Sequence, residues 1–390
     1  MAWFSSQDSL INALTSGQSW RYDWTKQMNP TTAAAAWEFH TLFRGNGNPW
    51  ADALFDTGTN LLFQGVTDTT TGATSIPHGG DVQPTYYKSL VNMSAFTSAA
   101  TTAPCVAVLV DLVWFYRKTS VTTLTAEATT NTLGYGDTFT ADDTTDIITW
   151  TSTANRPSNI LTWTRVQLTT TTTLPAGLAL ATNYYVIKLT DSTCKLATTY
   201  ANAIAGTAIN ITSTGTGTHT MSRLLPRYTN GAWVQAIFFN PAATALGAAT
   251  PNLSLGYTNS VQTGSRATPT VLPVGKTAAS NSLILYSGAS GAWKFNYQVP
   301  LMAWDAGIAE INTIQNSTSY VSGTYSVGLV KELARVPITT LGVAAERDLV
   351  NQLPSLPRIY DGAALFWLIG SSTTTPANAT FSGHILTSWN

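Results

Sequence analysis

The feature that most constrains the fold of this chain is a segment that occurs twice. Residues 225–232 read LPRYTNGA, and residues 356–363 read LPRIYDGA. Each copy runs directly into an apolar stretch, residues 233–239 in the first and 364–369 in the second. A turn followed by an apolar run is typical of a loop that leads into a buried strand.

The likeness extends on both sides of this segment. Upstream, residues 108–112 (VLVDL) resemble residues 328–333 (GLVKEL), and downstream a second extended run follows at 253–257 and again at 381–386. Self-similarity over such a span predicts two copies of one β-rich unit. The alternative is a chance match of two turn-plus-strand segments, because Pro, Asn, Asp and Gly are ordinary turn residues.

The spacing of the repeated anchors predicts an insertion. Leu225 lies 116 positions after Leu109, whereas Leu356 lies only 27 positions after Leu329, so the first copy is longer by 89 residues. That length is sufficient for a small domain, which we place at residues 137–221. Its short alternating runs predict an all-β domain. These runs are residues 147–150, 161–164, 166–168, 184–188 and 208–211.

The chain as a whole is therefore expected to be mainly β. We predict two related antiparallel β-sandwich or jelly-roll-like units, an inserted small all-β domain and a short helical N-terminal segment. The predicted division is 1–60 for an N-terminal arm with a short helix, 61–136 plus 222–265 for the first β unit, 137–221 for the inserted domain and 266–390 for the second β unit. An Asn-Pro start and an alanine run predict the helix over residues 29–40. In the second unit we expect strands at 282–286, 293–297 and 321–333.

Composition limits the kinds of partner. Charged residues make up only 10% of the chain, against about 25% in an average soluble protein. A surface rich in hydroxyls and amides suits packing against protein neighbours, because these groups cost less to desolvate than charges. The 19 basic and 20 acidic residues give a net charge of −1, which argues against binding to nucleic acid or an anionic membrane. No signal peptide and no membrane span are expected.

The residues that usually carry catalysis or bind metals are scarce and scattered. The four histidines, His40, His78, His219 and His384, show no metal-ligand spacing. The two cysteines, Cys105 and Cys194, fall in different predicted domains and are expected to be buried thiols. We therefore predict no catalytic, cofactor-binding or metal-binding residues and no cofactor. A Ser-His-Asp triad stays open, because its members meet only in space.

Two sets of acidic residues leave two other functions to consider, metal binding and glycoside hydrolysis. Asp137, Asp142, Asp143 and Asp146 cluster at the entry to the insertion, where we expect a solvated acidic turn rather than a metal site, because the spacing of a calcium loop is absent. Glycoside hydrolysis would need two carboxylates about 5 to 10 Å apart. The candidates are Asp305, Glu310, Glu332, Glu346, Asp348 and Asp361. We expect Glu332 with Lys331 and Glu346 with Arg347 to be surface ion pairs or solvated strand ends instead.

The insertion resembles a known module. In order it contains LPAGL at 174–178, TNYYVI at 182–187, KLAT at 195–198 and GTGTHT at 215–220. This order is similar to a small, immunoglobulin-like β module that recurs in structural proteins of tailed bacteriophages. The resemblance covers residues 137–221. It implies a non-enzymatic structural role and transfers no catalytic or binding residue.

The expected function is that of a structural component of a bacteriophage virion. We expect a capsid decoration, cement or minor capsid protein that stabilises the particle, contacts the major capsid protein or tail proteins, and assembles in the host cytoplasm. The alternatives are a tail or adaptor protein, or a receptor-binding protein that reads a host-surface glycan. By analogy with such proteins we expect a homo-oligomer, a trimer. Arg227 and Arg358 are expected to fix the turns of the repeat by hydrogen bonds to carbonyls.

Overall fold

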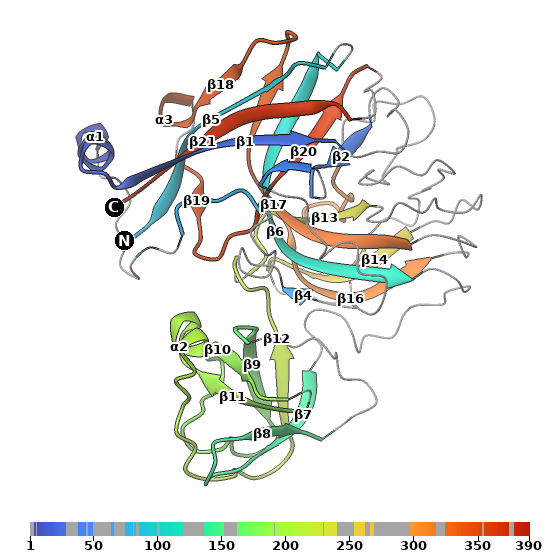
Figure 1. Cartoon of the computed structure of the whole chain (residues 1–390). Coiled ribbons are helices and arrows are strands. Elements are labelled where there is room, and N and C mark those ends of the chain that lie inside the picture. The colour runs from blue at the N-terminus through green and yellow to red at the C-terminus, as the bar shows by residue number, and fades with distance from the viewer. Residues whose placement is uncertain are drawn as a thin grey trace.

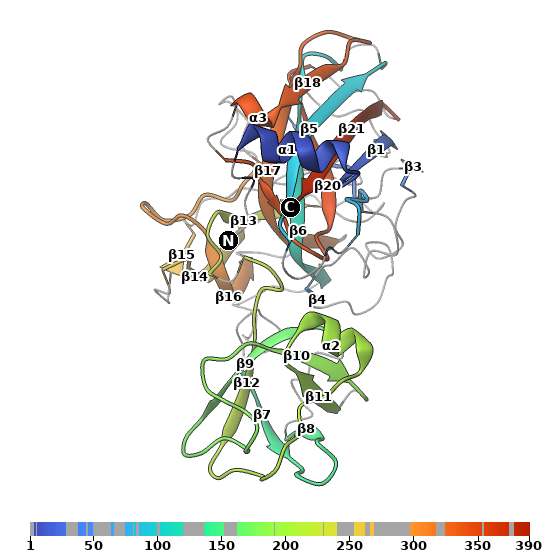
Figure 2. The same cartoon turned by 90° about the vertical axis from the view of Figure 1, so that its left-hand side faces the viewer.

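The protein is described by a computed structural model. It describes residues 4, 6–28, 38–43, 46–49, 64–65, 75–80, 82, 86–99, 102–119, 136–151, 162–190, 192–228, 230–239, 253–261, 266–268, 297–316, 324–352, 355–373 and 378–390. Within them the chain is mainly β, as predicted, with several antiparallel sheets and a short N-terminal helix. Figures 1 and 2 show a large β body and a smaller β lobe beneath it.

Three antiparallel sheets make up the body. The outer sheet contains β18 (Ala345–Asp348), β5 (Lys88–Thr97), β21 (Thr380–Trp389), β1 (Ser19–Gln27), β3 (Asn46–Asn48) and β19 (Arg358–Ile359). The central sheet contains β13 (Val234–Phe239), β17 (Thr324–Ile338), β6 (Cys105–Thr119), β20 (Leu365–Ser371), β2 (Phe39–Thr41) and β4 (Gln64–Gly65). The small sheet contains β15 (Arg266–Ala267), β14 (Leu253–Asn259) and β16 (Ile308–Asn316).

The long strands β6 and β17 join two sandwiches. One half of each strand packs against the outer sheet in a core that includes Leu109 and Val336. The other half packs against the small sheet in a core that includes Trp114 and Val327. Every residue of β20 is buried, because β20 lies between β6 and β2 and has apolar neighbours on both faces. Burial on both faces explains why its sequence is a continuous apolar run rather than an alternating one.

The two copies of the repeat are arranged symmetrically around the point where Asp111 of β6 lies opposite Lys331 of β17 in the central sheet. These two residues stand at the same position in their copies, and they face each other where β6 pairs with β17. Val234, nine residues after Leu225, pairs with Lys331, and Leu365, nine residues after Leu356, pairs with Asp111. Each repeated segment thus leads into a strand that pairs with the central strand of the other copy.

In the outer and small sheets, too, strands of one copy pair with strands of the other. β14, which belongs to the first copy, pairs with β16 of the second, and β21 of the second copy pairs with β5 of the first. The segments 61–136 plus 222–265 and 266–390, which we expected to form separate units, therefore contribute strands to common sheets. Strands that would be unpaired edges in two separate units are therefore hydrogen-bonded to a strand of the other copy.

The smaller lobe is a closed barrel inserted between β6 and β13. Its strands are β7 (Gly136–Ala141), β8 (Ile148–Trp150), β9 (Arg165–Thr170), β10 (Tyr184–Lys188), β11 (Thr193–Ala197) and β12 (His219–Arg223), and α2 (Tyr200–Ala205) follows β11. The barrel has its own apolar core, which includes Phe139, Trp150 and Leu196. The all-β character expected for the insertion is thus present in the structure.

Two strands expected in the insertion do not form. Within 161–164, Trp163 has a φ of 76°, a left-handed conformation that a strand does not allow. Its N–H donates to the carbonyl of Val186 in β10. Residues 208–211 are irregular, and Ile211 donates its N–H to the carboxylate of Asp146 instead of entering a ladder.

The N-terminal helix lies earlier than predicted. It is α1 (Gln7–Thr15), and Ser6 caps it by accepting a hydrogen bond of 3.1 Å from the N–H of Ser9. Of the predicted helix at 29–40, residues 29–37 lie outside the described residues, while Phe39 and His40 belong to β2. This end of the prediction is wrong, because pairing with β20 overrides the helix propensity of the alanine run before it.

The described part of the predicted N-terminal arm is built into the body. β1 pairs with β21 over its whole length, and the Trp24 side chain stacks on Trp367 with ring centroids 4.7 Å apart. The strands expected at 282–286 and over 293–296 lie outside the described residues. None of the helices in the described part of the chain has the length and apolar character that crossing a membrane requires.

Candidate functional site

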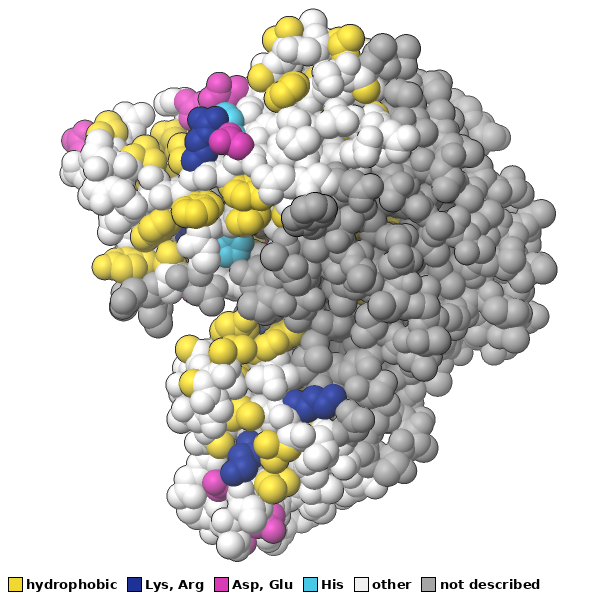
Figure 3. Space-filling view, in the orientation of Figure 1, with side chains coloured by type: hydrophobic (Ala, Val, Ile, Leu, Met, Phe, Trp, Pro, Cys, Tyr) yellow, Lys and Arg dark blue, Asp and Glu magenta, His cyan; other side chains and the backbone are white. Residues whose placement is uncertain are grey.

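The solvent-facing side of the outer sheet carries a polar hollow of about 350 Å³. Charged and histidine side chains gather at this part of the body in Figure 3, whereas much of the remaining described surface is uncharged. A cross-strand row forms its centre: Asp23 of β1 faces His384 of β21, His384 faces Ser94 of β5, and Ser94 faces Glu346 of β18. Alternation along each strand places these side chains outward and the apolar ones inward.

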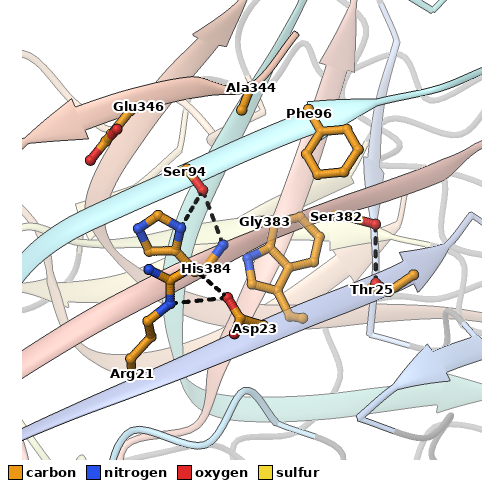
Figure 4. A pocket seen from close by; sticks show the side chains of 11 residues that line it. Arg21, Asp23, Thr25, Ser94, Phe96, Ala344, Glu346, Ser382, Gly383 and His384 are labelled. Atoms are coloured by element: carbon orange, nitrogen blue, oxygen red, sulfur yellow. Dashed lines mark hydrogen bonds and ion pairs between the residues drawn. The ribbon is translucent and has the colours of Figure 1, made fainter. Parts of the chain in front are cut away.

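Hydrogen bonds fix the protonation pattern of this row, and the one between Ser94 and His384 is drawn in Figure 4. The amide nitrogen of Asn92 donates to Glu346 Oε1 at 2.7 Å, so the amide oxygen of Asn92 faces His384 Nε2 at 2.9 Å. Since that oxygen only accepts, Nε2 carries the proton and Nδ1 accepts from the hydroxyl of Ser94 at 2.7 Å. Partial burial and then the Arg21 charge lower the pKa of His384, against the opposing carboxylates of Glu346 and Asp23. The imidazole is therefore neutral at pH 7.

This chain of contacts has the order of a nucleophile, a base and an orienting group. Acyl transfer also needs N–H donors aimed at the developing oxyanion. Ser94 lies inside β5, with β21 on one side and β18 on the other, so the backbone around it is committed to sheet pairing. The contacts hold His384 in one tautomer and give the hollow a rigid floor.

The two carboxylates of the hollow, Asp23 and Glu346, do not stand on neighbouring strands. Their strands, β1 and β18, are three steps apart in the sheet, which is about 14 Å at the backbone from a spacing of about 4.8 Å per step.

A second surface feature lies at one end of the small sheet. It consists of four exposed apolar side chains, Trp233, Val261, Met302 and Trp304, which we call the tryptophan patch. Trp304 is 100% exposed and Trp233 is 66% exposed. Hydrogen bonds join the three loops that carry the patch, since Trp233 N–H donates to Ala306 and Ser260 N–H donates to Gly307.

The loop that carries Trp304 is held rigidly. The buried carboxylate of Asp305 accepts hydrogen bonds from Tyr257, Asn259 and Arg266, at 2.7, 2.7 and 3.2 Å. Trp304 has a φ of 74° and Trp233 a φ of 61°, a conformation that is costly for residues with a side chain. Such strain persists where surrounding contacts impose it and is concentrated at functional positions.

The arginines of the repeat have different roles. Arg227 is buried, donates to the carbonyls of Gly362 and Leu112, and pairs with the carboxylate of Asp111. The expected contact with carbonyls is confirmed for Arg227. Arg358, its counterpart, places its guanidinium 4.0 Å from the ring centre of Tyr87 and 4.2 Å from that of Tyr360. Both arginines therefore make structural contacts.

The other carboxylates considered from sequence are held by separate donors. Glu332 pairs with Arg335 at 2.7 Å instead of Lys331, and Glu346 contacts Asn92 instead of Arg347. The two ion pairs that were one of the expectations for these residues do not form, because neighbours along a strand point to opposite faces. Glu310 accepts from Thr258, Asp348 from the N–H of Val350, and Asp361 from the N–H of Val82.

The acidic cluster of the insertion is divided among different partners. Asp137 lies 3.5 Å from Arg223, and Asp146 lies 4.0 Å from Lys195. Asp142 accepts from the N–H groups of Thr144 and Thr145, which lowers its pKa. Among the described residues no group of three His, Cys, Asp or Glu side chains is placed to hold a metal ion.

The histidines and cysteines occupy unrelated places. His40 is buried in β2, His78 is buried in an irregular segment, His219 contacts Thr170 in the barrel, and His384 lies in the hollow. Cys105 and Cys194 are free and buried, as predicted. The hollow and the tryptophan patch were both missed by sequence reasoning. The alternation of polar residues at 21, 23 and 25 was the available signal for the hollow.

Comparison with known proteins adds little. No protein-family model and no curated protein matches the chain. Among solved structures, the chain is similar to the crystal structure of the infectious bursal disease virus VP2 subviral particle, at 12% sequence identity and a TM-score of 0.15, over 80% of this chain and 83% of that chain. A TM-score of 0.15 does not indicate a shared fold.

Proposed function

We propose that the chain is a non-enzymatic structural component of a bacteriophage virion, a capsid decoration, cement or minor capsid protein that stabilises the particle. The observation that carries this proposal is the tryptophan patch on a chain whose charged content is only 10%. Exposed apolar patches mark interaction sites, and tryptophan and methionine are enriched in the buried centres of protein interfaces.

The rigidity of the patch supports the same role. Binding energy concentrates in a few aromatic anchors, and it is greatest when the free protein already holds them in the bound conformation. Asp305 holds the Trp304 loop, and the bond from Trp233 to Ala306 ties the second indole to it. In the proposed role these indoles seat in a neighbouring virion protein.

The barrel fits the role of a projecting domain. It contains the stretch that resembles the bacteriophage β module, and Figures 1 and 2 show it as a lobe beside the body. In this proposal the body contacts the particle and the barrel extends from it.

The test is to localise the protein on particles and to weaken the patch. Label on the head shell supports the decoration role, whereas label on the tail favours the tail or adaptor alternative. The double variant Trp233→Ala, Trp304→Ala is expected to keep its melting temperature within a few degrees and to lose incorporation into particles. Leu180→Ala, Leu189→Ala is the matched control, because both leucines are exposed on the barrel. Normal incorporation of the tryptophan variant would contradict the proposal.

The proposed oligomer is a trimer. Light scattering of the isolated protein at micromolar concentration measures it directly. A monomeric mass would count against the trimer and would leave the proposed location on the particle to the labelling experiment.

A further inference from the structure

We propose that the hollow on the outer sheet is a binding site for a neutral saccharide. The inference does not depend on the structural role proposed above, because it concerns another surface and is tested on the isolated protein. It also differs from a glycan site in the inserted barrel, since the residues of the hollow belong to β1, β5, β21, β18 and the residue before β18.

The hollow presents both hydrogen-bond donors and hydrogen-bond acceptors. A sugar hydroxyl donates and accepts at once, so it is best held between acceptor-only carboxylates and donor-only guanidinium groups. The hollow offers Asp23 and Glu346 as acceptors and Arg21 as a donor. Arg21 and Asp23 are both exposed, with 59% and 71% of their side chains accessible. Arg21 donates from Nε and Nη2 to Oδ1 of Asp23 at 3.2 and 3.0 Å, and Asn92 donates to Oε1 of Glu346. Each carboxylate has about four acceptor positions, so these contacts leave the second oxygen of each for a ligand.

An apolar wall lies beside these polar groups. Phe96 of β5 is partly exposed and lines the hollow, and Figure 4 shows its ring beside the polar row. A pyranose has an apolar C–H face as well as hydroxyl edges, and an aromatic ring can cover that face. Thr25 and Ser382, joined at 3.0 Å, line the same side.

The net charge of the hollow favours a neutral ligand. With His384 neutral, the hollow holds one positive and two negative side chains, Arg21, Asp23 and Glu346, and so carries a net charge of −1. Phosphates and acidic sugars are repelled by that charge. Metal coordination by His384 is disfavoured, because both of its ring nitrogens are engaged by Ser94 and Asn92. A neutral hydroxyl-rich ligand remains the best match.

The binding groups of the hollow are held rigidly by the sheet. His384, Ser94 and Asn92 lie on two central strands and are linked to Glu346, so the groups that a ligand meets are held before it arrives. A site built on strands loses little conformational entropy on binding.

The experiment uses the full chain and a panel of neutral oligosaccharides of glucose, galactose and N-acetylglucosamine, together with sialylated counterparts. Binding is measured first on an array and then by titration with the free sugars. We expect at least one neutral sugar to bind and its sialylated form to bind more weakly at low salt. Phe96→Ala and Glu346→Gln are each expected to weaken binding about tenfold, the effect of losing about 1.4 kcal/mol.

Two control variants keep the proposal falsifiable. Ile204→Ala, on the exposed face of α2 in the barrel, is expected to bind normally. Phe96→Tyr keeps an aromatic ring and is expected to restore most of the affinity lost in Phe96→Ala. Failure of all neutral sugars at millimolar concentration, equal binding by the hollow variants, or loss only in the barrel variant would each overturn the proposal.

Discussion

The carboxylate of Asp111 and the guanidinium of Arg227 form a buried, two-pronged ion pair, with Arg227 Nη2 2.6 Å from Oδ1 and Nε 2.9 Å from Oδ2. Tyr228 and the N–H of Ala364 complete the shell of Asp111. Since Asp111 and Arg227 belong to the first copy of the repeat and Ala364 to the second, this cluster ties the two copies together. Burial and the Asp111 charge raise the pKa of Tyr228 well above its ordinary value, so its hydroxyl remains a donor.

Replacing Arg227 by Ala should lower the free energy of unfolding by about 3 to 5 kcal/mol, because it leaves the buried carboxylate of Asp111 unpaired. Arg358→Ala is the matched control at the equivalent position. It removes contacts with Tyr87 and Tyr360 on a partly exposed side chain, worth about 0.5 to 2 kcal/mol. Urea denaturation of both variants measures the difference. Equal losses would show that the ion pair does not hold the copies together.

Removing residues 137–221 should leave the body folded. Gly136 pairs with Ser222, so the two ends of the deletion are neighbours across one antiparallel pair, about 5 Å apart. The barrel core is formed by barrel residues alone. Calorimetry of the deleted protein should show one cooperative transition close to that of the body in the full chain. A broad, non-cooperative transition would indicate that the barrel supports the body.

Acid should weaken the fold through His40. Complete burial lowers the pKa of His40 to about 4, whereas the unfolded chain titrates near 6.5. Between these values the unfolded state binds more protons, so stability is full above pH 6.5 and falls as the pH drops. The total loss is about 3 kcal/mol, reached near pH 4.

His40→Gln cannot take up this proton, so its stability should change less with pH between 6.5 and 4 than that of the native protein. Chemical denaturation across that range measures both slopes. The carboxylates titrate in both proteins and cancel in the comparison. Parallel profiles would show that His40 is not responsible for the acid sensitivity.

Neither cysteine should react in the folded protein. Burial raises the pKa of Cys105 to about 12 and raises that of Cys194 as well. At pH 8 only about one Cys105 in ten thousand would be a thiolate, which is the reactive form. A chromogenic disulfide reagent should label no thiol in buffer and two in denaturant. Rapid labelling without denaturant would mean that a buried strand of the body or barrel opens readily.

The sequence by itself determined the class of the fold and its internal repetition. The runs at 108–112 and 184–188 lie in β6 and β10, because a strand that lies against a core needs apolar residues at the positions it buries. The unequal spacing after Leu109 and Leu329 located the barrel, because an insertion leaves its length in the chain whatever its fold. Burial of both cysteines followed from the general tendency of free cysteines to be buried.

Tertiary structure alone decided which strands pair and which side chains meet. Asp111 and Arg227 are 116 positions apart, and Ser94 and His384 are 290 apart. Nothing local brings them together, since sheet pairing is set by packing between distant segments. The same pairing turned the tail of the predicted helix into β2. The repeat specified two like units, but only the register between β6 and β17 made each unit complete the other.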